Sequence, residues 1–131
     1  MIPVQLIFAL CAVESNHNPR AIGDGGKAVG VLQITPICVD DVNRICKAGV
    51  SSTPRAFTMD DRYDPDASKL MCQIYLDHYA SRHSLEGMAR IWNGGPNGAN
   101  DLSTIPYWKK VRAVLLQLCP EGRVGEEIIG P

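Results

Sequence analysis

The sequence predicts a single domain that is mainly α in an α+β arrangement, with about five or more helices and one small β-hairpin. Apolar residues recur at helical spacing in several segments. Two helices have a recognisable start, in which a capping residue precedes a proline, at Thr35-Pro36 and Asp64-Pro65. One glycine-rich stretch, residues 20–34, alternates weakly, as a short hairpin does. The chain of 131 residues can form one compact core and is too short for two.

The first predicted helix covers Ile2 to Asn16 and contains the longest apolar run of the chain, residues 7–13. Pro3 suits the first turn of this helix, because a proline at that position loses no hydrogen bond. The hairpin follows, and Thr35 is then expected to cap a second helix from Pro36 to about Lys47.

The third predicted helix begins at Pro65, after a long connection over residues 48–63 that holds a short capped turn at residues 58–61. Apolar residues continue at helical spacing as far as Tyr79, so the helix should extend to that point. The buried face predicted for it consists of Ala67, Leu70, Met71, Ile74, Tyr75, His78 and Tyr79.

The last two predicted helices flank a loop of asparagine, glycine and proline, residues 93–98. Ser84 should cap the first of them, which ends at Trp92, and Pro106 should open the second, which ends near Cys119. The buried face predicted for the last helix consists of Tyr107, Val111, Val114, Leu115 and Leu118.

The overall composition excludes several functional classes. The net charge is -1 and no basic stripe is interleaved with aromatic residues, which argues against nucleic acid as a partner. No segment has the roughly 20 apolar residues that span a bilayer. No Lys or Arg precedes the first apolar run and no small-residue cleavage site follows it, so we expect no export signal in this chain. We expect a monomer, with residues 1–120 as the domain and residues 121–131 as a loose C-terminal tail.

The cysteine and histidine pattern indicates neither a cofactor nor a metal site. Neither the CxxC nor the HxxxH spacing of a zinc site occurs. Cys38 and Cys46 fall in one predicted helix, about 12 Å apart along its axis, which is too far for a disulfide. The cysteines are therefore interpreted mainly as small apolar side chains, with one or two disulfides left open, and they are Cys11, Cys38, Cys46, Cys72 and Cys119.

One acidic residue stands at the end of the longest apolar run. Glu14 follows this run, and Ile7, Leu10 and Cys11 should lie on its own face of the helix. Burial and the negative end of a helix both raise the pKa of a carboxyl group, so Glu14 is suited to donate a proton near neutral pH. The alternative is that Glu14 merely ends the apolar face and points into water.

Three segments are polar or glycine-rich where a purely structural chain would not need them. They are Glu14-Ser15, residues 23–34 and residues 89–96. The second segment carries a further acid, Asp24, within a turn of glycines, and the third ends in Asn93-Gly94-Gly95-Pro96. Together they indicate a catalytic site more strongly than any one of them alone.

In order and spacing, these segments resemble the motifs of the goose-type lysozyme and soluble lytic transglycosylase superfamily. Its members have an apolar helix ending in Glu-Ser, then a Gly-x-x-Gln motif, then an aromatic-Asn-x-Gly segment. The matching residues here are Glu14-Ser15, Gly30-Val31-Leu32-Gln33 and Trp92-Asn93-Gly94-Gly95. The helix at Asp64-Pro65 also resembles the transglycosylase helix between these motifs. Residues 89–96, with Tyr107-Trp108-Lys109-Lys110-Val111, are similar to invertebrate-type lysozymes, and the resemblance covers roughly residues 3–118.

The resemblance implies a lysozyme-like fold and an enzyme that cleaves glycans. Glu14 matches the catalytic acid of the superfamily, and Gln33 and Asn93 match residues near the saccharide. Asp24 stands where goose-type lysozymes have an acid that many lytic transglycosylases lack. The chain departs from goose-type lysozymes at Thr35, where they have a further Asp, and this departure puts the activation of water in doubt.

The same residues suit the cleavage of a β-1,4 glycosidic bond. Glu14 can protonate the leaving oxygen, and Asp24, if it lies across the sugar, can activate a water molecule. If Asp24 is only a turn residue, a hydroxyl of the substrate can attack instead and give an anhydro product. We expect Ser15, Gln33, Trp92 and Asn93 to bind the sugars. For Gln33 the alternative is a brace for the hairpin, and for Trp92, which replaces the usual transglycosylase Tyr, it is core packing.

We therefore predict a muramidase whose partner is the glycan strand of peptidoglycan and whose place of action is the cell wall, in a secreted, periplasmic or phage-associated setting. Three alternatives stay open: a lytic transglycosylase, an enzyme acting on chitin, and an inactive glycan-binding or phage structural module. Glu14 argues against the last one, because a binding module has no need of a poorly solvated acid.

Overall fold

Five α-helices and two short β-hairpins form the part of the chain that the computed structural model describes, residues 2–49 and 56–130. The helices are α1 (Val4–Ser15), α2 (Pro36–Lys47), α3 (Pro65–Ala80), α4 (Leu85–Gly94) and α5 (Ile105–Leu118). The hairpins pair β1 (Ile22–Gly23) with β2 (Ala28–Val29) and β3 (Arg123–Val124) with β4 (Glu127–Ile128). Short 3-10 helices lie at η1 (Asp24–Gly26), η2 (Met59–Tyr63), η3 (Gly98–Asn100) and η4 (Leu102–Thr104). The mainly helical α+β class is confirmed.

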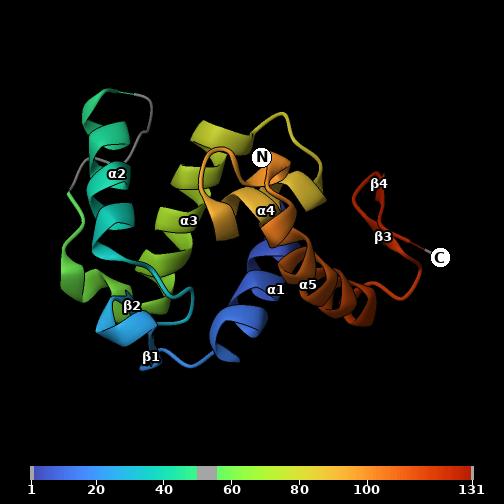
Figure 1. Ribbon diagram of the computed structural model, residues 1–131, viewed down its shortest axis with the longest axis horizontal. Helices are drawn as coiled ribbons and strands as arrows, with labels where there is room; N and C mark the ends of the chain where they lie inside the picture. The colour runs from blue at the N-terminus through green and yellow to red at the C-terminus, as the bar shows by residue number, and fades with distance from the viewer. Residues whose placement is uncertain (1, 50–55, 131) are drawn as a thin grey trace.

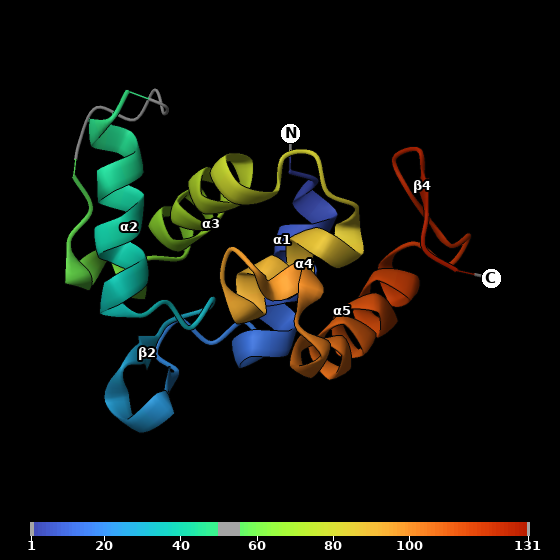
Figure 2. The ribbon, with the colours of Figure 1, turned by 45° about the horizontal axis from the view of Figure 1, so that its top comes forward.

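The helices form two groups. In Figures 1 and 2, α2 lies at the outer left edge, and α3 lies between α2 and the group formed by α1, α4 and α5. The β1–β2 hairpin lies below α2 and α3 in both views. None of the helices within the described residues is long and apolar enough to cross a membrane.

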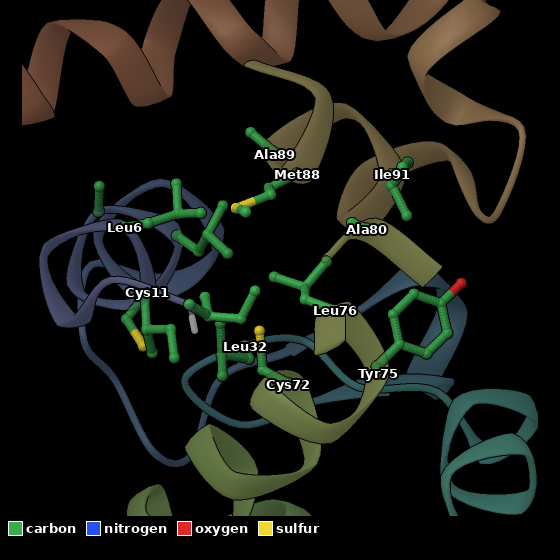
Figure 3. Packing of buried hydrophobic residues seen from close by; sticks show 14 of the residues in the cluster. Leu6, Cys11, Leu32, Cys72, Tyr75, Leu76, Ala80, Met88, Ala89 and Ile91 are labelled. Carbon is green, nitrogen blue, oxygen red and sulfur yellow. The ribbon is translucent and has the colours of Figure 1, made fainter. Parts of the chain in front are cut away.

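The core is built around α1, which packs against α3, α4 and α5. Figure 3 shows Leu6 and Cys11 of α1 facing Leu76 of α3 and Met88 of α4, with Leu32 from the loop after β2 between Cys11 and Cys72 in this view. These side chains are buried, and α1 is buried from Leu6 to Cys11 except at Phe8, so the middle of this helix lies inside the molecule. The acid that follows this buried stretch is therefore placed at the edge of the core.

The predicted starts of α2, α3 and α4 are confirmed, whereas α1 begins at Val4 rather than Ile2, with Pro3 as its N-cap, and α5 begins at Ile105, one residue before Pro106. The Thr35 hydroxyl accepts a hydrogen bond from the Cys38 N–H at 3.3 Å, and the Ser84 hydroxyl accepts one from the Gly87 N–H at 3.2 Å. The Asp64 carboxylate caps α3 in the same way, and Pro36 and Pro65 stand in the first turns of α2 and α3. These caps satisfy N–H groups that the first turn of a helix leaves without partners.

The predicted hairpin is present and is clamped to the segment before α3. Ile22 pairs with Val29, and the Arg62 guanidinium donates hydrogen bonds to the carbonyls of Lys27 at 3.0 Å and Ile34 at 3.2 Å. Gly30 has a φ of 86°, and a β-carbon at this position would collide with the Arg62 carbonyl oxygen. Glycine is therefore required where the hairpin meets η2. Residues 50–55 of the predicted connection lie outside the described residues.

Some predicted burial is corrected by the structure. Leu70 and His78 on α3 and Leu118 on α5 are exposed, although they were assigned to buried faces. The third helix contacts α1, α2 and α4, so it buries a different and wider stripe than its apolar periodicity indicates. On α5, the buried aromatic residue is Trp108.

The end of α4 also differs from the prediction. The helix continues two residues beyond Trp92, to Gly94, before Gly95 turns the chain with a φ of 87°.

The segment after α5 is not a loose tail. Val124 and Ile129 are buried against the core, and the Arg112 guanidinium donates a hydrogen bond to the Ile129 carbonyl at 2.5 Å. The Glu127 carboxylate accepts the Leu85 N–H at 3.0 and 3.1 Å, so this hairpin caps the start of α4. The sequence did not indicate this contact, because it joins residues far apart in the chain. The division of the chain at residue 120 stays a prediction.

All five cysteines are free thiols, so reductant is expected to leave the thermal stability unchanged. A native disulfide typically contributes about 2–5 kcal/mol, and a loss of that size would lower the melting temperature by many degrees. Thermal melts with and without dithiothreitol measure the difference, and a thiol titration of the unfolded chain provides the control count of five. A drop of several degrees under dithiothreitol would contradict this assignment.

Candidate active site

A cleft of about 580 Å³ runs between α1, the first hairpin, α2, α3 and the end of α4. It brings together five of the six side chains that the sequence predicted for the site, and these are Glu14, Asp24, Gln33, Trp92 and Asn93. The sixth, Ser15, does not line the cleft. Residues from three distant segments of the chain therefore meet in one cavity.

Glu14 is held at the wall of this cleft by two aromatic side chains. The Tyr107 hydroxyl donates a hydrogen bond to Glu14 Oε2 at 2.8 Å, and the Trp92 side chain is also hydrogen-bonded to this carboxyl group. Burial raises the pKa of Glu14 from 4.5 to about 7, against the lowering effect of these two hydrogen bonds. The predicted rise of the pKa is confirmed, and its cause is the loss of solvation.

An acid with a pKa of about 7 is partly protonated at neutral pH and gives up its proton readily. The Tyr107 hydroxyl fixes one oxygen of Glu14, so the orientation of the other oxygen in the cleft is set as well. This arrangement has the properties of a general acid.

The raised pKa makes the stability of the fold depend on pH. Unfolding returns the pKa of Glu14 from about 7 to 4.5, so the folded chain binds more protons than the unfolded chain between these values. Stability should therefore fall as the pH rises through this window, by roughly 3 kcal/mol in total, and it should be fully retained below it. Glu14→Gln cannot ionise, so we expect it to melt near the wild-type temperature at about pH 4 and well above it at about pH 8.

Thermal melts across this pH range measure the effect, and exposed Glu121 provides the matched control. Glu121→Gln should follow the wild-type pH profile at every pH. Equal melting temperatures for wild type and Glu14→Gln at high pH would contradict the raised pKa.

Ser15 joins the end of α1 to the hairpin loop. Its hydroxyl lies 3.2 Å from the Cys11 carbonyl and 2.8 Å from the Val31 carbonyl, and it accepts the Asn18 N–H at 3.1 Å. These contacts fix the position of the neighbouring Glu14 relative to the hairpin. A contact between Ser15 and substrate stays a prediction.

Asp24 projects from the glycine-rich turn between β1 and β2. It starts η1 with a φ of 51°, and Gly25 and Gly26 follow with φ values of 64° and 96°. Three successive residues in the left-handed region make a turn that most other sequences resist. The turn leaves the Asp24 side chain exposed at the cleft that Glu14 also lines.

Gln33 both lines the cleft and braces the hairpin. Its amide nitrogen donates hydrogen bonds to the carbonyls of Ala21 and Gly30, each at 3.1 Å. Its amide oxygen lies against Gly23, where a β-carbon would collide with it. The brace that was the alternative interpretation of Gln33 is therefore present, and binding of a sugar by Gln33 stays a prediction.

Trp92 and Asn93 stand at the end of α4, beside a loop that is held by a buried arginine. The Arg90 guanidinium donates hydrogen bonds to the Thr104 hydroxyl at 2.8 Å and to the Asp101 carbonyl at 3.1 Å. Trp92 is half-buried and packs edge-on against Tyr75, with ring centroids 5.5 Å apart, whereas Asn93 is exposed. This network fixes the α4 end of the cleft.

Sequence reasoning missed two residues of the site. It placed Tyr107 on a core face, and it did not single out Asp41, whose carboxylate lines the cleft from α2. The sequence did contain a signal for Tyr107, because Tyr107-Trp108 belongs to a segment that is similar to invertebrate-type lysozymes.

The site offers no cluster of metal ligands. Among residues 2–49 and 56–130, no three His, Cys, Asp or Glu side chains gather closely enough to hold a metal ion.

A mainly helical fold with a half-buried acid of raised pKa at the wall of a cleft is typical of a lysozyme-like domain. The chain belongs to the family described as the transglycosylase SLT domain, which its residues 1–114 match.

Invertebrate lysozymes are similar in sequence and in structure. Lysozyme 1 of Crassostrea virginica is 31% identical over 127 residues, which cover 86% of this chain and 60% of that protein. An invertebrate-type lysozyme of Ruditapes philippinarum is 34% identical over 55 residues, or 39% of this chain and 40% of that protein. The chain thus spans less than two thirds of the length of these two relatives.

Solved lysozyme structures match over most of the chain. The inhibitor-bound lysozyme from Meretrix lusoria matches with a TM-score of 0.70 and 26% identity, over 86% of this chain and 89% of that one. The Tapes japonica lysozyme matches with a TM-score of 0.68 and 26% identity, over 95% of this chain and 94% of that one. The suspected superfamily and the likeness to invertebrate-type lysozymes are confirmed.

Proposed function

We propose that the protein is a muramidase that cleaves the β-1,4 bond between N-acetylmuramic acid and N-acetylglucosamine in the glycan strands of peptidoglycan. The observation that carries the proposal is Glu14, a carboxyl group with a pKa of about 7 at the wall of a cleft of about 580 Å³. A cleft of this volume suits a short stretch of sugar chain. Membership of the transglycosylase SLT domain family and the similarity to lysozymes support the substrate class.

In this mechanism Glu14 transfers its proton to the glycosidic oxygen as the bond to the anomeric carbon breaks. The hydrogen bonds from Tyr107 and Trp92 hold the carboxyl group in place and stabilise the carboxylate that remains. Asp24 takes a proton from a water molecule, whose oxygen then bonds to the anomeric carbon. Gln33 and Asn93, in the cleft wall, supply amide groups for the sugar acetamido and hydroxyl groups.

A lytic transglycosylase is the second candidate, and the family match favours it. In that reaction a hydroxyl of the muramic acid attacks its own anomeric carbon, the attacking hydroxyl loses its proton to the ionised Glu14, and a 1,6-anhydro sugar is released. Glu14 has the same first role in both routes, so the routes differ in whether Asp24 and a water molecule take part.

Lysis of purified walls tests the proposal. A fall in turbidity with purified peptidoglycan, and none with chitin, is the expected result. Equal activity on chitin would shift the substrate class to N-acetylglucosamine polymers. Binding to walls with no cleavage products at any pH between about 4 and 8 would identify an inactive glycan-binding module, because Glu14 should be at least partly protonated over most of this range.

A further inference from the structure

The cleft contains a second fixed carboxylate that the cleavage mechanism does not use. Three residues of α2, Ile37, Cys38 and Asp41, line the cleft, and their spacing places them on one face of the helix. In Figures 1 and 2, α2 forms the outer left edge of the molecule, whereas α1, which carries Glu14 in its last turn, lies nearer the centre. Asp41 therefore belongs to the opposite wall of the cleft.

The Asp41 carboxylate is held in one orientation by two side chains. Its Oδ1 accepts hydrogen bonds from Arg44 Nε at 2.9 Å and Nη2 at 2.7 Å, and its Oδ2 accepts the Tyr79 hydroxyl at 2.6 Å. Arg44 Nη2 also donates to the Tyr79 oxygen at 2.9 Å. A carboxylate has about four lone-pair sites, so these three bonds leave Oδ2 able to accept one more. The Asp41 side chain is 24% exposed, which leaves it accessible from the cleft.

The charge of this group suits a neutral donor. Partial burial acts to raise the pKa of Asp41, but the hydrogen bonds from Tyr79 and Arg44 and the positive charge of Arg44 outweigh it, so the pKa is lowered. The carboxylate is thus ionised at neutral pH, while the adjacent Arg44 cancels most of its field at longer range. A free cation is therefore only weakly attracted to the Asp41–Arg44 pair. A neutral N–H or O–H group that points at Oδ2 can still form a charge-assisted hydrogen bond with it.

Apolar surface borders the carboxylate. Ile37, one turn before Asp41, is 80% exposed at the cleft, and Tyr75 lines the cleft from α3. An acetamido group presents an N–H donor beside a methyl group, which matches a carboxylate next to an aliphatic side chain. We infer that Asp41 accepts a hydrogen bond from an N-acetylated sugar unit bound against Ile37, on the far wall of the cleft from the bond that is cut. This inference rests on the proposed glycan-cleaving function.

The hydrogen bonds that Tyr79 forms with Asp41 and Arg44 also link α3 to α2. An experiment must therefore distinguish a purely structural role of Asp41 from recognition of the sugar. A residue that binds a sugar away from the reacting bond contributes equally to the ground state and the transition state. Its loss raises KM and leaves kcat nearly unchanged. Loss of a structural link would disturb the cleft and lower kcat.

The test uses Asp41→Asn, with Asp40→Asn as the matched control. Asp40 is the neighbouring exposed residue, carries the same charge and does not line the cleft. On glycan strands freed of their peptides, Asp41→Asn should raise KM about tenfold, equivalent to about 1.4 kcal/mol, with kcat within about twofold of wild type. Asp40→Asn should match wild type in both constants.

Two outcomes on peptide-free strands would overturn the inference: an unchanged KM, or a kcat lowered well beyond twofold. If KM rises only on strands that keep their peptides, Asp41 acts on the peptide and the inference fails as well. If wild type cleaves no glycan, the proposed function fails by itself. Binding of peptide-free strands to Glu14→Gln, with and without Asp41→Asn, then decides the role of Asp41, and an equal affinity of the two variants would refute it.

Discussion

Glu14→Gln is expected to abolish wall lysis while the fold stays intact. The substitution keeps the shape of the side chain, and the amide oxygen can still accept the Tyr107 hydroxyl that lies 2.8 Å from Glu14 Oε2. It removes the only proton that Glu14 can pass to the leaving oxygen. General acid catalysis contributes about 10²–10⁴-fold to such reactions, so the rate should fall by at least about 100-fold. Turbidity of purified walls measures the loss, and circular dichroism confirms the fold.

Glu121→Gln is the matched control, because Glu121 is exposed and lies outside the cleft. It should lyse walls at the wild-type rate. Lysis by Glu14→Gln within about threefold of wild type would remove Glu14 from the mechanism, since the loss of a general acid costs far more. The assignment would then have to pass to another acid of the cleft, and Asp24 and Asp41 are the acids that line it with Glu14.

Local chemistry explains which parts of the fold the sequence predicted. Thr35, Asp64 and Ser84 cap the helices they were expected to cap, because a capping side chain bonds to backbone only a few residues away. The pKa of Glu14 was predicted to rise for a similar reason, since the apolar run before it lies in the same helix. Each of these predictions needed no knowledge of distant contacts.

The residues that the sequence did not reveal act across long separations. Tyr107 bonds to Glu14 from 93 positions further along the chain, and Tyr79 bonds to Asp41 from 38 positions away. Apolar periodicity assigns an aromatic residue to a core face and does not report whether its hydroxyl reaches an acid. Glu127 was assigned to a tail for the same reason, because its partner at Leu85 can be found only in the folded chain.

The outcome of the cut should depend on Asp24. Inverting glycosidases hold their two carboxyl groups about 6.5–9.5 Å apart, with room for a water molecule between them. The left-handed turn places Asp24 at the cleft that Glu14 lines, on the hairpin side. Thr35 cannot replace it as a base, because a hydroxyl does not ionise near neutral pH and this one caps α2 through the Cys38 N–H. A hydrolytic route would therefore rely on Asp24.

We accordingly expect hydrolysis with a reducing-end product, and a fall in rate of about 100-fold or more in Asp24→Asn. Asparagine tolerates the left-handed backbone at position 24, where φ is 51°, so the turn should survive the substitution. Asp60→Asn, at an exposed residue that does not line the cleft, is the control for the loss of one charge. Mass spectrometry of digested peptidoglycan distinguishes hydrolysis from transglycosylation, because a hydrolytic product is heavier by one water than the 1,6-anhydro product. If anhydro products dominate and Asp24→Asn is nearly as active as wild type, Asp24 is only a turn residue and the enzyme is a lytic transglycosylase.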